Sequence, residues 1–243
     1  MVKDTGKSSL RIASYNIRKA RGRGWRHDPT RLLPVLNGLG ADVLALQEAD
    51  HRLGQRHAAI PRKMIEAETD FRVVDVAEND HSLGWHGNAV LLHRSRAVSV
   101  VRRINLPGLE PRGAVAVELE TGEVIVATHL GLRRRDRQRQ LQEIRQAVRT
   151  DGPVIIAGDF NEWSAKQGLE PLEDAFSVVA PGRSFHSARP IAALDRIAHS
   201  MDITLADAGV VDTSTARRAS DHLPIWADLS RTGRESPPKP PAP

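Results

Sequence analysis

Short runs of apolar residues, separated by turn-forming residues, recur along most of the chain. Runs of about four to eight aliphatic and β-branched residues between turn signals are typical of strands. Several runs are joined only by a short turn, such as Thr121-Gly122, which indicates antiparallel pairing. The runs that predict strands are 10–16, 42–47, 71–76, 88–93, 97–104, 114–119, 123–128, 154–157, 203–206 and 223–229.

Three segments carry apolar residues at the spacing of one helix face instead. Residues 29–39 predict a helix, and Asp28 is placed to cap its first turn ahead of Pro29. Residues 61–69 predict a second helix. Residues 134–149 predict the clearest one, since their apolar positions recur at three- and four-residue intervals.

Strands outnumber helices, so most of the apolar surface must be buried between sheets. Two mainly antiparallel sheets packed face to face, with helices outside, would bury most of the runs. The predicted fold class is therefore α/β, of the α+β type. We expect a single domain over residues 9–230 and a flexible N-terminus over 1–8. The final stretch SPPKPPAP holds five prolines, so 231–243 are predicted to form a Pro-rich disordered tail.

Composition narrows the chemistry. The chain has no cysteine, which excludes a disulfide framework, a thiolate metal site and a cysteine nucleophile. Its net charge of +5 and pI near 10 favour binding to anions such as phosphate, nucleic acid or acidic lipid headgroups. The first residues have no apolar segment of a signal peptide, and no run approaches the ~20 residues of a membrane helix. We therefore expect a cytoplasmic protein without a transmembrane segment.

Several apolar runs end in a residue that can bind metal or phosphate. Taken singly, each such residue is typical of a turn, a cap or a solvated surface. Together they are hard to explain as turn chemistry repeated by chance, and they favour one shared site. The residues are Asn16, Glu48, His129, Asp159, Asn161, Asp195, Asp221 and His222.

The stretch GDFN over 158–161 is the clearest case in which a turn and a shared site can be compared. Its run of apolar residues, 154–157, predicts a buried strand, and Gly158 is expected to let the chain bend after it. A turn explains the glycine. It does not explain why Asp159 and Asn161 stand together at the end of a buried strand, where a rigid scaffold would fix their direction.

These stretches resemble the endonuclease/exonuclease/phosphatase superfamily of metal-dependent phosphoesterases, which includes the DNase I-like enzymes. The matching motifs occur in the family's order from Ser14 to Pro224. They are SYNIR (14–18), LQE (46–48), GNAVL (87–91), THL (128–130), GDFN (158–161), LDRI (194–197) and SDHLP (220–224). The resemblance implies a four-layered α/β/β/α sandwich with its site at one end of the two sheets.

The resemblance also implies roles for the candidate residues. Glu48, Asn16 and Asp221 would hold Mg²⁺, with Mn²⁺ as an alternative, because such hard cations take oxygen ligands. His222 would contact the attacking water or the phosphate, oriented by Asp195.

Other members of the set would act on water and phosphate. By resemblance Asp159 positions or deprotonates the water and Asn161 binds a phosphoryl oxygen; either Asp159 or His222 could be the formal base. His129 matches a second histidine in DNases and sphingomyelinases, as general acid or phosphate contact. Asn88 would orient His129 or touch phosphate, and Arg112 is a further phosphate contact.

Two positions depart from the pattern of the abasic-site endonucleases. Arg18 stands where some of them have a carboxylate, as it does in the DNase-like branch, and is a candidate substrate contact. Ala192 replaces the aromatic residue that lines an abasic-sugar pocket. An abasic-site repair role is therefore disfavoured.

The substrate is less defined than the chemistry. Residues 131–149 hold seven arginines against two carboxylates, and residues 18–26 combine basic residues with Trp25. Such patches favour a nuclease acting on DNA or RNA. A solvated helix face explains them equally well, and acidic phospholipid would be attracted by the same charges. The alternatives are the same hydrolysis of a phospholipid, sphingomyelin or inositol phosphate, and a protein that binds nucleic acid or membrane without catalysis.

Overall fold

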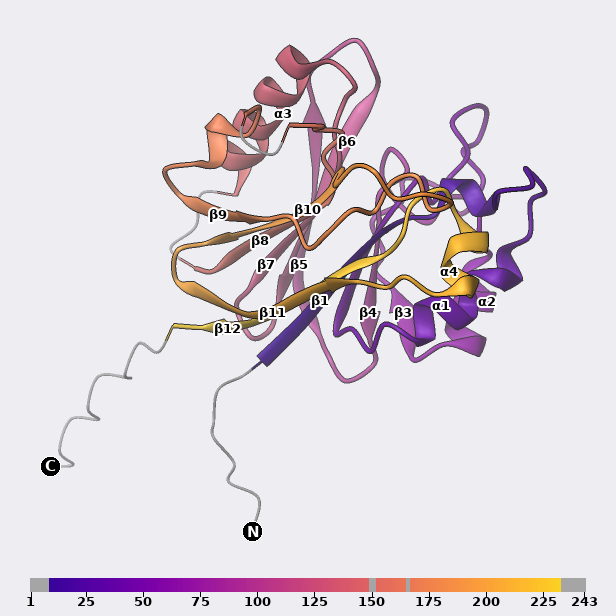
Figure 1. Cartoon of the computed structure of the whole chain (residues 1–243). Coiled ribbons are helices and arrows are strands. Elements are labelled where there is room, and N and C mark those ends of the chain that lie inside the picture. The colour runs from indigo at the N-terminus through magenta and orange to yellow at the C-terminus, as the bar shows by residue number, and fades with distance from the viewer. Residues whose placement is uncertain (1–8, 149–151, 165–166, 233–243) are drawn as a thin grey trace, which may run out of the picture.

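The computed structural model of the chain describes residues 9–148, 152–164 and 167–232. Within these residues, two six-stranded sheets pack face to face (Figure 1). The first sheet has the order β11-β12-β1-β2-β4-β3. Its strands are β1 (Ser9–Asn16), β2 (Val43–Gln47), β3 (Phe71–Val73), β4 (Ala89–His93), β11 (Ile203–Val210) and β12 (Ile225–Arg231).

The second sheet has the order β5-β6-β7-β8-β10-β9. Its strands are β5 (Val98–Leu106), β6 (Arg112–Leu119), β7 (Val124–His129), β8 (Val154–Asp159), β9 (Phe176–Val179) and β10 (Asp195–Ser200). The prediction of two mainly antiparallel sheets is confirmed. Each sheet has one parallel pair at its centre, β1 with β2 and β7 with β8.

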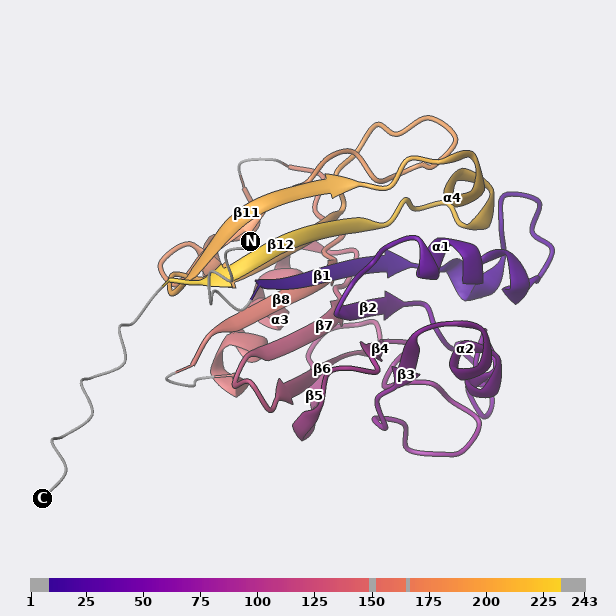
Figure 2. The ribbon, with the colours of Figure 1, turned by 90° about the horizontal axis from the view of Figure 1, so that it is seen from below.

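Helices cover the outer faces of both sheets, which completes four layers (Figures 1 and 2). The helices α1 (Leu33–Asn37), α2 (Arg62–Glu68) and α4 (Ser214–Ala219) lie by the first sheet, and α3 (Arg134–Ala147) covers the second. Three hydrophobic cores follow from this layering. One lies between the sheets, and one lies between each sheet and its helices. Burial in these cores accounts for the apolar runs of the sequence.

The helix expected over 29–39 is divided into two pieces. A 3₁₀ turn, Pro29–Arg31, begins at Asp28, whose side chain accepts from the Thr30 amide as expected for an N-cap. The α-helix α1 begins only at Leu33. Pro34 has no amide hydrogen to donate into the preceding turn, which explains why the two pieces do not form one regular helix. Two further 3₁₀ turns are Arg18–Ala20 and Glu170–Leu172.

Other expectations also need correction. The strands β9 and β10 and the helix α4 were not predicted. Gly158 does not bend the chain, because β8 continues through it to Asp159 and pairs with both neighbouring strands. Arg231 belongs to β12, so the predicted tail does not begin there. The expectations for 1–8 and for 233–243 lie outside the described residues.

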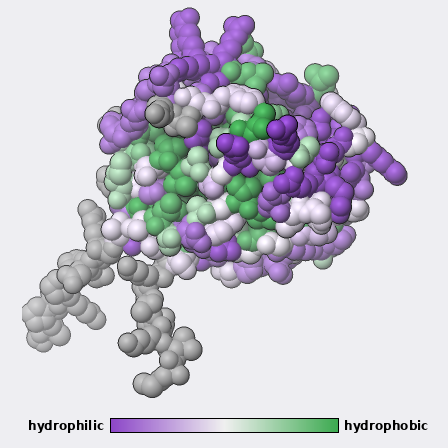
Figure 3. All heavy atoms as spheres, in the orientation of Figure 1, coloured by the Kyte–Doolittle hydropathy of each residue, from purple (hydrophilic) through white to green (hydrophobic). Residues whose placement is uncertain are grey.

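Among the described residues, no helix combines the length and hydrophobicity needed to span a membrane. The hydrophilic side chains that gather over α3, at the top of Figure 3, agree with the exposed arginines of that helix.

Candidate active site

The two central parallel pairs direct their carboxyl ends to the same edge of the sandwich. Asn16 and Gln47 are register partners at the end of one pair, and His129 and Asp159 at the end of the other. The hydrogen bond from Asn16 Nδ2 to Asp159 Oδ2, 3.1 Å long, joins the two sheets here. Residues far apart in the sequence therefore meet because strand direction, not local sequence, places them.

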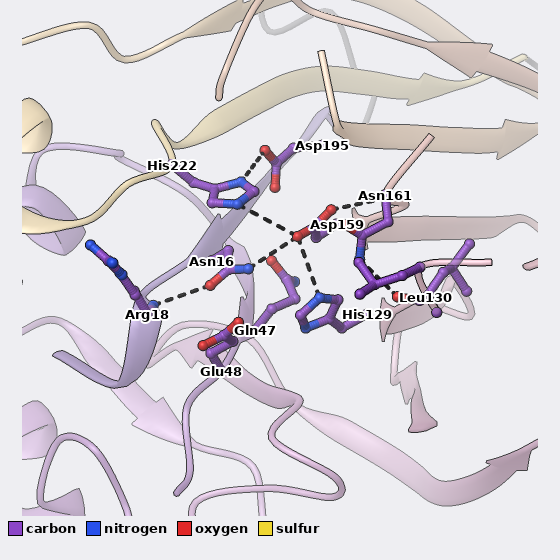
Figure 4. Close-up of polar contacts among 12 residues, drawn as sticks. Asn16, Arg18, Gln47, Glu48, His129, Leu130, Asp159, Asn161, Asp195 and His222 are labelled. Atoms are coloured by element: carbon purple, nitrogen blue, oxygen red, sulfur yellow. Dashed lines mark hydrogen bonds and ion pairs between the residues drawn. The ribbon is translucent and has the colours of Figure 1, made fainter. Parts of the chain in front are cut away.

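Asp159 lies at the centre of the cluster (Figure 4). Its Oδ2 accepts from Asn16 and lies 3.4 Å from His129 Nε2 and 3.7 Å from His222 Nε2. The side chain is 2% exposed. A buried carboxylate needs such hydrogen-bonding partners to stay charged, so Asn16 and the two imidazoles hold it in a defined direction.

Asp159 and Asn161 also form a local turn. The amide of Asn161 donates to Asp159 Oδ1 at 2.9 Å, and Asn161 has the left-handed φ of 51° that asparagine tolerates better than most residues. The Asn161 side chain donates to the Leu130 carbonyl at 2.9 Å. The spacing of the two residues thus fixes the Asp159 carboxylate and ties the loop after β8 to the loop after β7.

His222 and Asp195 form a buried pair. His222 Nδ1 donates to Asp195 Oδ2 at 2.8 Å, and the hydroxyl of Ser184 donates to the same oxygen. Burial disfavours the charged imidazole, yet the carboxylates of Asp195 and Asp159 outweigh burial and raise the pKa of His222 to about 10. His222 is therefore an imidazolium near neutral pH, with its Nε2–H facing Asp159.

His129 has the opposite protonation. Its side chain is almost entirely buried, and burial lowers its pKa to about 3 although the nearby Asp159 carboxylate acts the other way. The imidazole is neutral near pH 7 and can donate only one hydrogen bond from the ring. The two histidines on either side of Asp159 thus differ in charge.

Glu48 and Asn16 offer oxygen ligands in the lining of one pocket. Glu48 follows β2 with a left-handed φ of 53°, and the ammonium group of Lys19 forms an ion pair with its carboxylate. Because Lys19 already provides a cation there, the place accommodates positive charge. A carboxylate and an amide oxygen suit a hard divalent cation, so these donors fit Mg²⁺ or Mn²⁺.

Asp221 contacts Arg18, two residues after Asn16. Its carboxylate pairs with Arg18 Nε at 3.1 Å, and it does not line the pocket of Glu48. Asn16 Oδ1 in turn accepts from the Arg18 amide at 3.1 Å (Figure 4). Of the three predicted metal ligands, the structure brings Glu48 and Asn16 into the pocket and leaves Asp221 beside it.

A second arrangement of possible ligands is buried deeper. Ligand atoms of Asp159, Asp195 and His222 lie within 4.8 Å of one another. However, Asp195 Oδ2 already accepts from His222 and from Ser184. These contacts are typical of a carboxylate, Asp195, that orients an imidazole, His222. They are not typical of two side chains that bind one ion.

The pocket has a volume of about 640 Å³ and opens beside this cluster. Its walls combine the candidate residues with a basic and apolar rim from other loops. The lining residues are Asn16, Lys19, Glu48, Asp50, His51, Arg52, Leu53, Arg56, His86, Gly87, Glu110, Pro111, Arg112, His129, Leu132, Asp159, Asn161 and His222. A pocket of this size and polarity admits a phosphate group with part of the alcohol attached to it.

The three residues expected to contact substrate differ in position. Arg112 lines the pocket and pairs with Glu110 at 2.7 Å, while its Nε is buried without a partner among the described residues. Asn88 is wholly buried; its amide donates to the carbonyls of Gly113 and Trp85 and not to His129. Arg18 lies 4.2 Å from the Trp25 ring and pairs with Asp221, outside the pocket lining.

Four contributors to this region were not predicted from the sequence. Lys19 pairs with Glu48, Ser184 supports Asp195, and Arg52 and Arg56 line the pocket. Lys19 lies inside the basic stretch 18–26, so its position three residues after Asn16 was a usable signal. Nothing in the sequence around Ser184 indicates its partner, which is 11 positions further along.

Comparison with known proteins identifies the family of the chain. A profile of the Endonuclease/Exonuclease/phosphatase family matches residues 13–222. The chain is 29% identical over 252 residues to the Uncharacterized protein YbhP of Escherichia coli strain K12, a match that covers 94% of this chain and 99% of YbhP.

Solved structures are similar to this chain in their fold. The endonuclease/exonuclease/phosphatase from Beutenbergia cavernae has a TM-score of 0.71 at 21% identity, covering 93% of this chain and 72% of that one. TDP2 from D. rerio, complexed with single-strand DNA product, has a TM-score of 0.68 at 17% identity, covering 91% and 99%. The match over residues 13–222 includes Asn16, Glu48, His129, Asp159, Asp195 and His222, and the chain belongs to the endonuclease/exonuclease/phosphatase family of hydrolytic phosphoesterases.

Proposed function

We propose that this phosphoesterase hydrolyses phosphodiesters with the help of Mg²⁺ or Mn²⁺, and that Asp159 accepts the proton of the attacking water. The observation that carries the proposal is the position of Asp159. It is the one carboxylate of the candidate set that contacts Asn16, His129 and His222 together and also lines the pocket. A base must lie within hydrogen-bond reach of the water that it deprotonates, and the pocket provides that place.

The two histidines support Asp159 as the base. His222 donates Nδ1–H to Asp195 and, as an imidazolium, has no free lone pair with which to take a proton. Its Nε2–H is left to bind a phosphoryl oxygen and to stabilise the negative charge that develops there. Neutral His129 can donate a hydrogen bond to the phosphate or to the departing oxygen, which favours a contact role over that of a general acid.

Glu48 and Asn16 would hold the divalent cation, with Asp221 as a further carboxylate next to them. When bound, the cation would neutralise phosphate charge and stabilise the leaving oxygen. Asn161 would keep Asp159 aligned through its main-chain amide, since its side chain is held by Leu130.

Nucleic acid stays the predicted substrate class from the sequence, and a cytoplasmic location likewise stays a prediction. Support for nucleic acid from residues 131–149 is smaller than the sequence indicated. Arg137 is buried against Glu162 at 2.6 Å, Arg134 pairs with Glu170, and Arg145 pairs with Asp174. These arginines neutralise carboxylates of this chain and fasten α3 to its surroundings, so they are not free for phosphate.

Hydrolysis of bis(p-nitrophenyl) phosphate tests the chemistry without assuming the natural substrate. We expect hydrolysis with Mg²⁺ or Mn²⁺ and none in excess EDTA. Asp159→Ala and His222→Ala should abolish it, whereas Asp75→Asn, which removes a largely exposed carboxylate elsewhere, should not. Full activity in EDTA would contradict the metal requirement, and full activity of both alanine variants would contradict the residue assignment.

A further inference from the structure

Large hydrophobic side chains are exposed mainly at the end of the sandwich where the pocket opens. Nine such residues are exposed among the described residues, and six of them belong to loops that leave this end. The six, here called the apolar rim, are Trp25, Leu53, Leu109, Leu132, Trp163 and Ile191, with exposed fractions of 57% to 86%.

The strand register places these six loops together. Loops 17–28 and 48–58 follow the parallel ends of β1 and β2, and loops 130–133 and 160–164 follow those of β7 and β8. Loop 107–111 joins β5 to β6 at the same edge, since β6 begins beside the end of β7. Asp195, where β10 begins, is the register partner of Asp159, so loop 180–194 also meets this edge.

Contacts within the site connect the apolar rim to the pocket. Leu53 and Leu132 line it, and the Leu132 amide donates to Glu110 in the loop of Leu109 at 3.1 Å. On the other side, the ring of Phe185 lies 4.9 Å from that of His222 and 6.1 Å from that of Trp163.

The remaining two members are attached in the same way. The Ile191 amide donates to the Phe185 carbonyl at 2.7 Å, and Trp25 lies against Arg18, the partner of Asp221. Each member of the apolar rim is therefore at most two contacts away from a candidate site residue or the pocket wall.

The same loops carry an excess of positive charge. They contain ten arginines and lysines and five carboxylates. Several of the arginines, including Arg21, Arg23, Arg26, Arg133 and Arg189, are exposed and form no ion pair with any described residue. Glu48, Glu110 and Glu162, by contrast, are each paired with a cation of this chain.

We propose that the apolar rim and its arginines dock this enzyme on an anionic lipid bilayer, so that the pocket faces the phosphodiester headgroups. The proposal rests on the proposed function and names its substrate class. Isolated aliphatic side chains at loop tips can enter the interface of a bilayer, tryptophan favours the same depth, and arginine binds anionic headgroups.

Single-stranded nucleic acid is the competing partner, and the composition of the apolar rim disfavours it. Stacking of bases needs aromatic rings, yet four of the six side chains are leucine or isoleucine. Aliphatic side chains exposed at four separate loops form few favourable contacts with a phosphate backbone. Transfer of each of them into a hydrocarbon phase, in contrast, lowers the free energy.

Co-sedimentation with vesicles tests the docking independently of catalysis. We expect the whole protein to bind vesicles of phosphatidylcholine and phosphatidylglycerol, to bind phosphatidylcholine alone weakly, and to lose binding as salt is raised. The double variant Leu109→Ser and Ile191→Ser should weaken binding at least about tenfold, because neither apolar side chain can then be buried in lipid. Both residues are exposed and outside the pocket lining, so bis(p-nitrophenyl) phosphate hydrolysis should remain.

Met201→Ser is the matched control. Met201 is 61% exposed but lies in the turn after β10, at the opposite end of the sheet, so its variant should bind vesicles like the wild type. The docking is wrong if the wild type ignores anionic vesicles or if the double variant binds them as tightly. A second result would also contradict the docking. In it, a single-stranded oligonucleotide binds the protein, vesicles do not displace it, and the double variant Trp25→Ser and Trp163→Ser no longer binds it. Absence of hydrolysis with intact vesicle binding would instead contradict the proposed function.

Discussion

The ammonium group of Lys19 forms an ion pair with the carboxylate of Glu48, and the Lys19 amide donates to the Glu48 carbonyl at 3.0 Å. Lys19 is thus fixed to Glu48 by both its side chain and its main chain. Because Glu48 is the first candidate for holding a divalent cation, any such cation must share or replace the contact with Lys19. Lys19 would therefore compete with a divalent cation at the proposed metal site.

Replacement of Lys19 by methionine should strengthen Mg²⁺ binding by about three- to tenfold. The variant keeps the length of the side chain but removes a positive charge that both occupies Glu48 and repels the ion. Isothermal titration calorimetry with MgCl₂ measures the effect, and Lys63→Met on the surface of α2 is the control. Unchanged or weaker Mg²⁺ binding would show that Lys19 does not compete at Glu48.

Replacement of Asp195 by asparagine should lower kcat for bis(p-nitrophenyl) phosphate by about 10² to 10⁴, with a small change in KM. The amide cannot stabilise the imidazolium of His222 and can reverse its hydrogen bond. Ser184→Ala removes only a supporting hydrogen bond and should cost no more than about tenfold. Equal losses in the two variants would mean that Asp195 acts mainly in packing.

Replacement of Gly158 by alanine should lower the free energy of unfolding by at least about 2 kcal/mol. A Cβ at this position would lie 1.9 Å from the Thr128 carbonyl oxygen, a main-chain atom that cannot move without disturbing β7. Urea denaturation measures the loss. Gly24→Ala is a matched control, because nothing lies within 4 Å of its added Cβ.

The free energy of unfolding should decrease as the pH is lowered, partly because of His129. Its pKa is about 3 in the folded chain and near 6.5 in the unfolded chain, so between these values the unfolded state binds more protons. The contribution is complete above pH 6.5 and is lost as pH falls toward 3.

Comparison with His129→Asn isolates this contribution. As pH is lowered from 7 to 4, the free energy of unfolding of the wild type should fall by more than that of the variant, by an amount on the order of a few kcal/mol. His57→Asn, at an exposed position, should follow the wild type. Parallel curves for wild type and His129→Asn would contradict the neutral state of His129.

The sequence allowed most strands to be predicted because their apolar runs are continuous. It failed at β10, where Asp195, Arg196 and His199 are polar yet buried, so the strand lacks an apolar pattern. The helix α4 is too short for periodicity to show, and α1 is shortened by Pro34, whose effect depends on the turn before it.

The residues of the candidate site could be predicted from the sequence, but their contacts with one another could not. These residues were identifiable because most of them follow an apolar run and because the motifs around them resemble those of the family. The parallel pairs that bring them to one edge of the sandwich were not predicted. Which cation pairs with Glu48 or Asp221, and which carbonyls Asn88 bonds, depend on loops that meet only in the folded chain. For this reason Asn88 and Arg18 were expected to touch substrate, whereas the structure gives them partners within the protein.

The position of β12 has a consequence for how the enzyme is made. The strand β12 inserts between β11 and β1, pairing Leu10 with Leu229 and Ser14 with Ile225. Until it arrives, β1 keeps an open edge, and His222 cannot reach Asp195. A nascent chain emerging from the ribosome would therefore stay inert until β12 has been synthesised and has paired with β1, and the onset of hydrolysis would report that folding step.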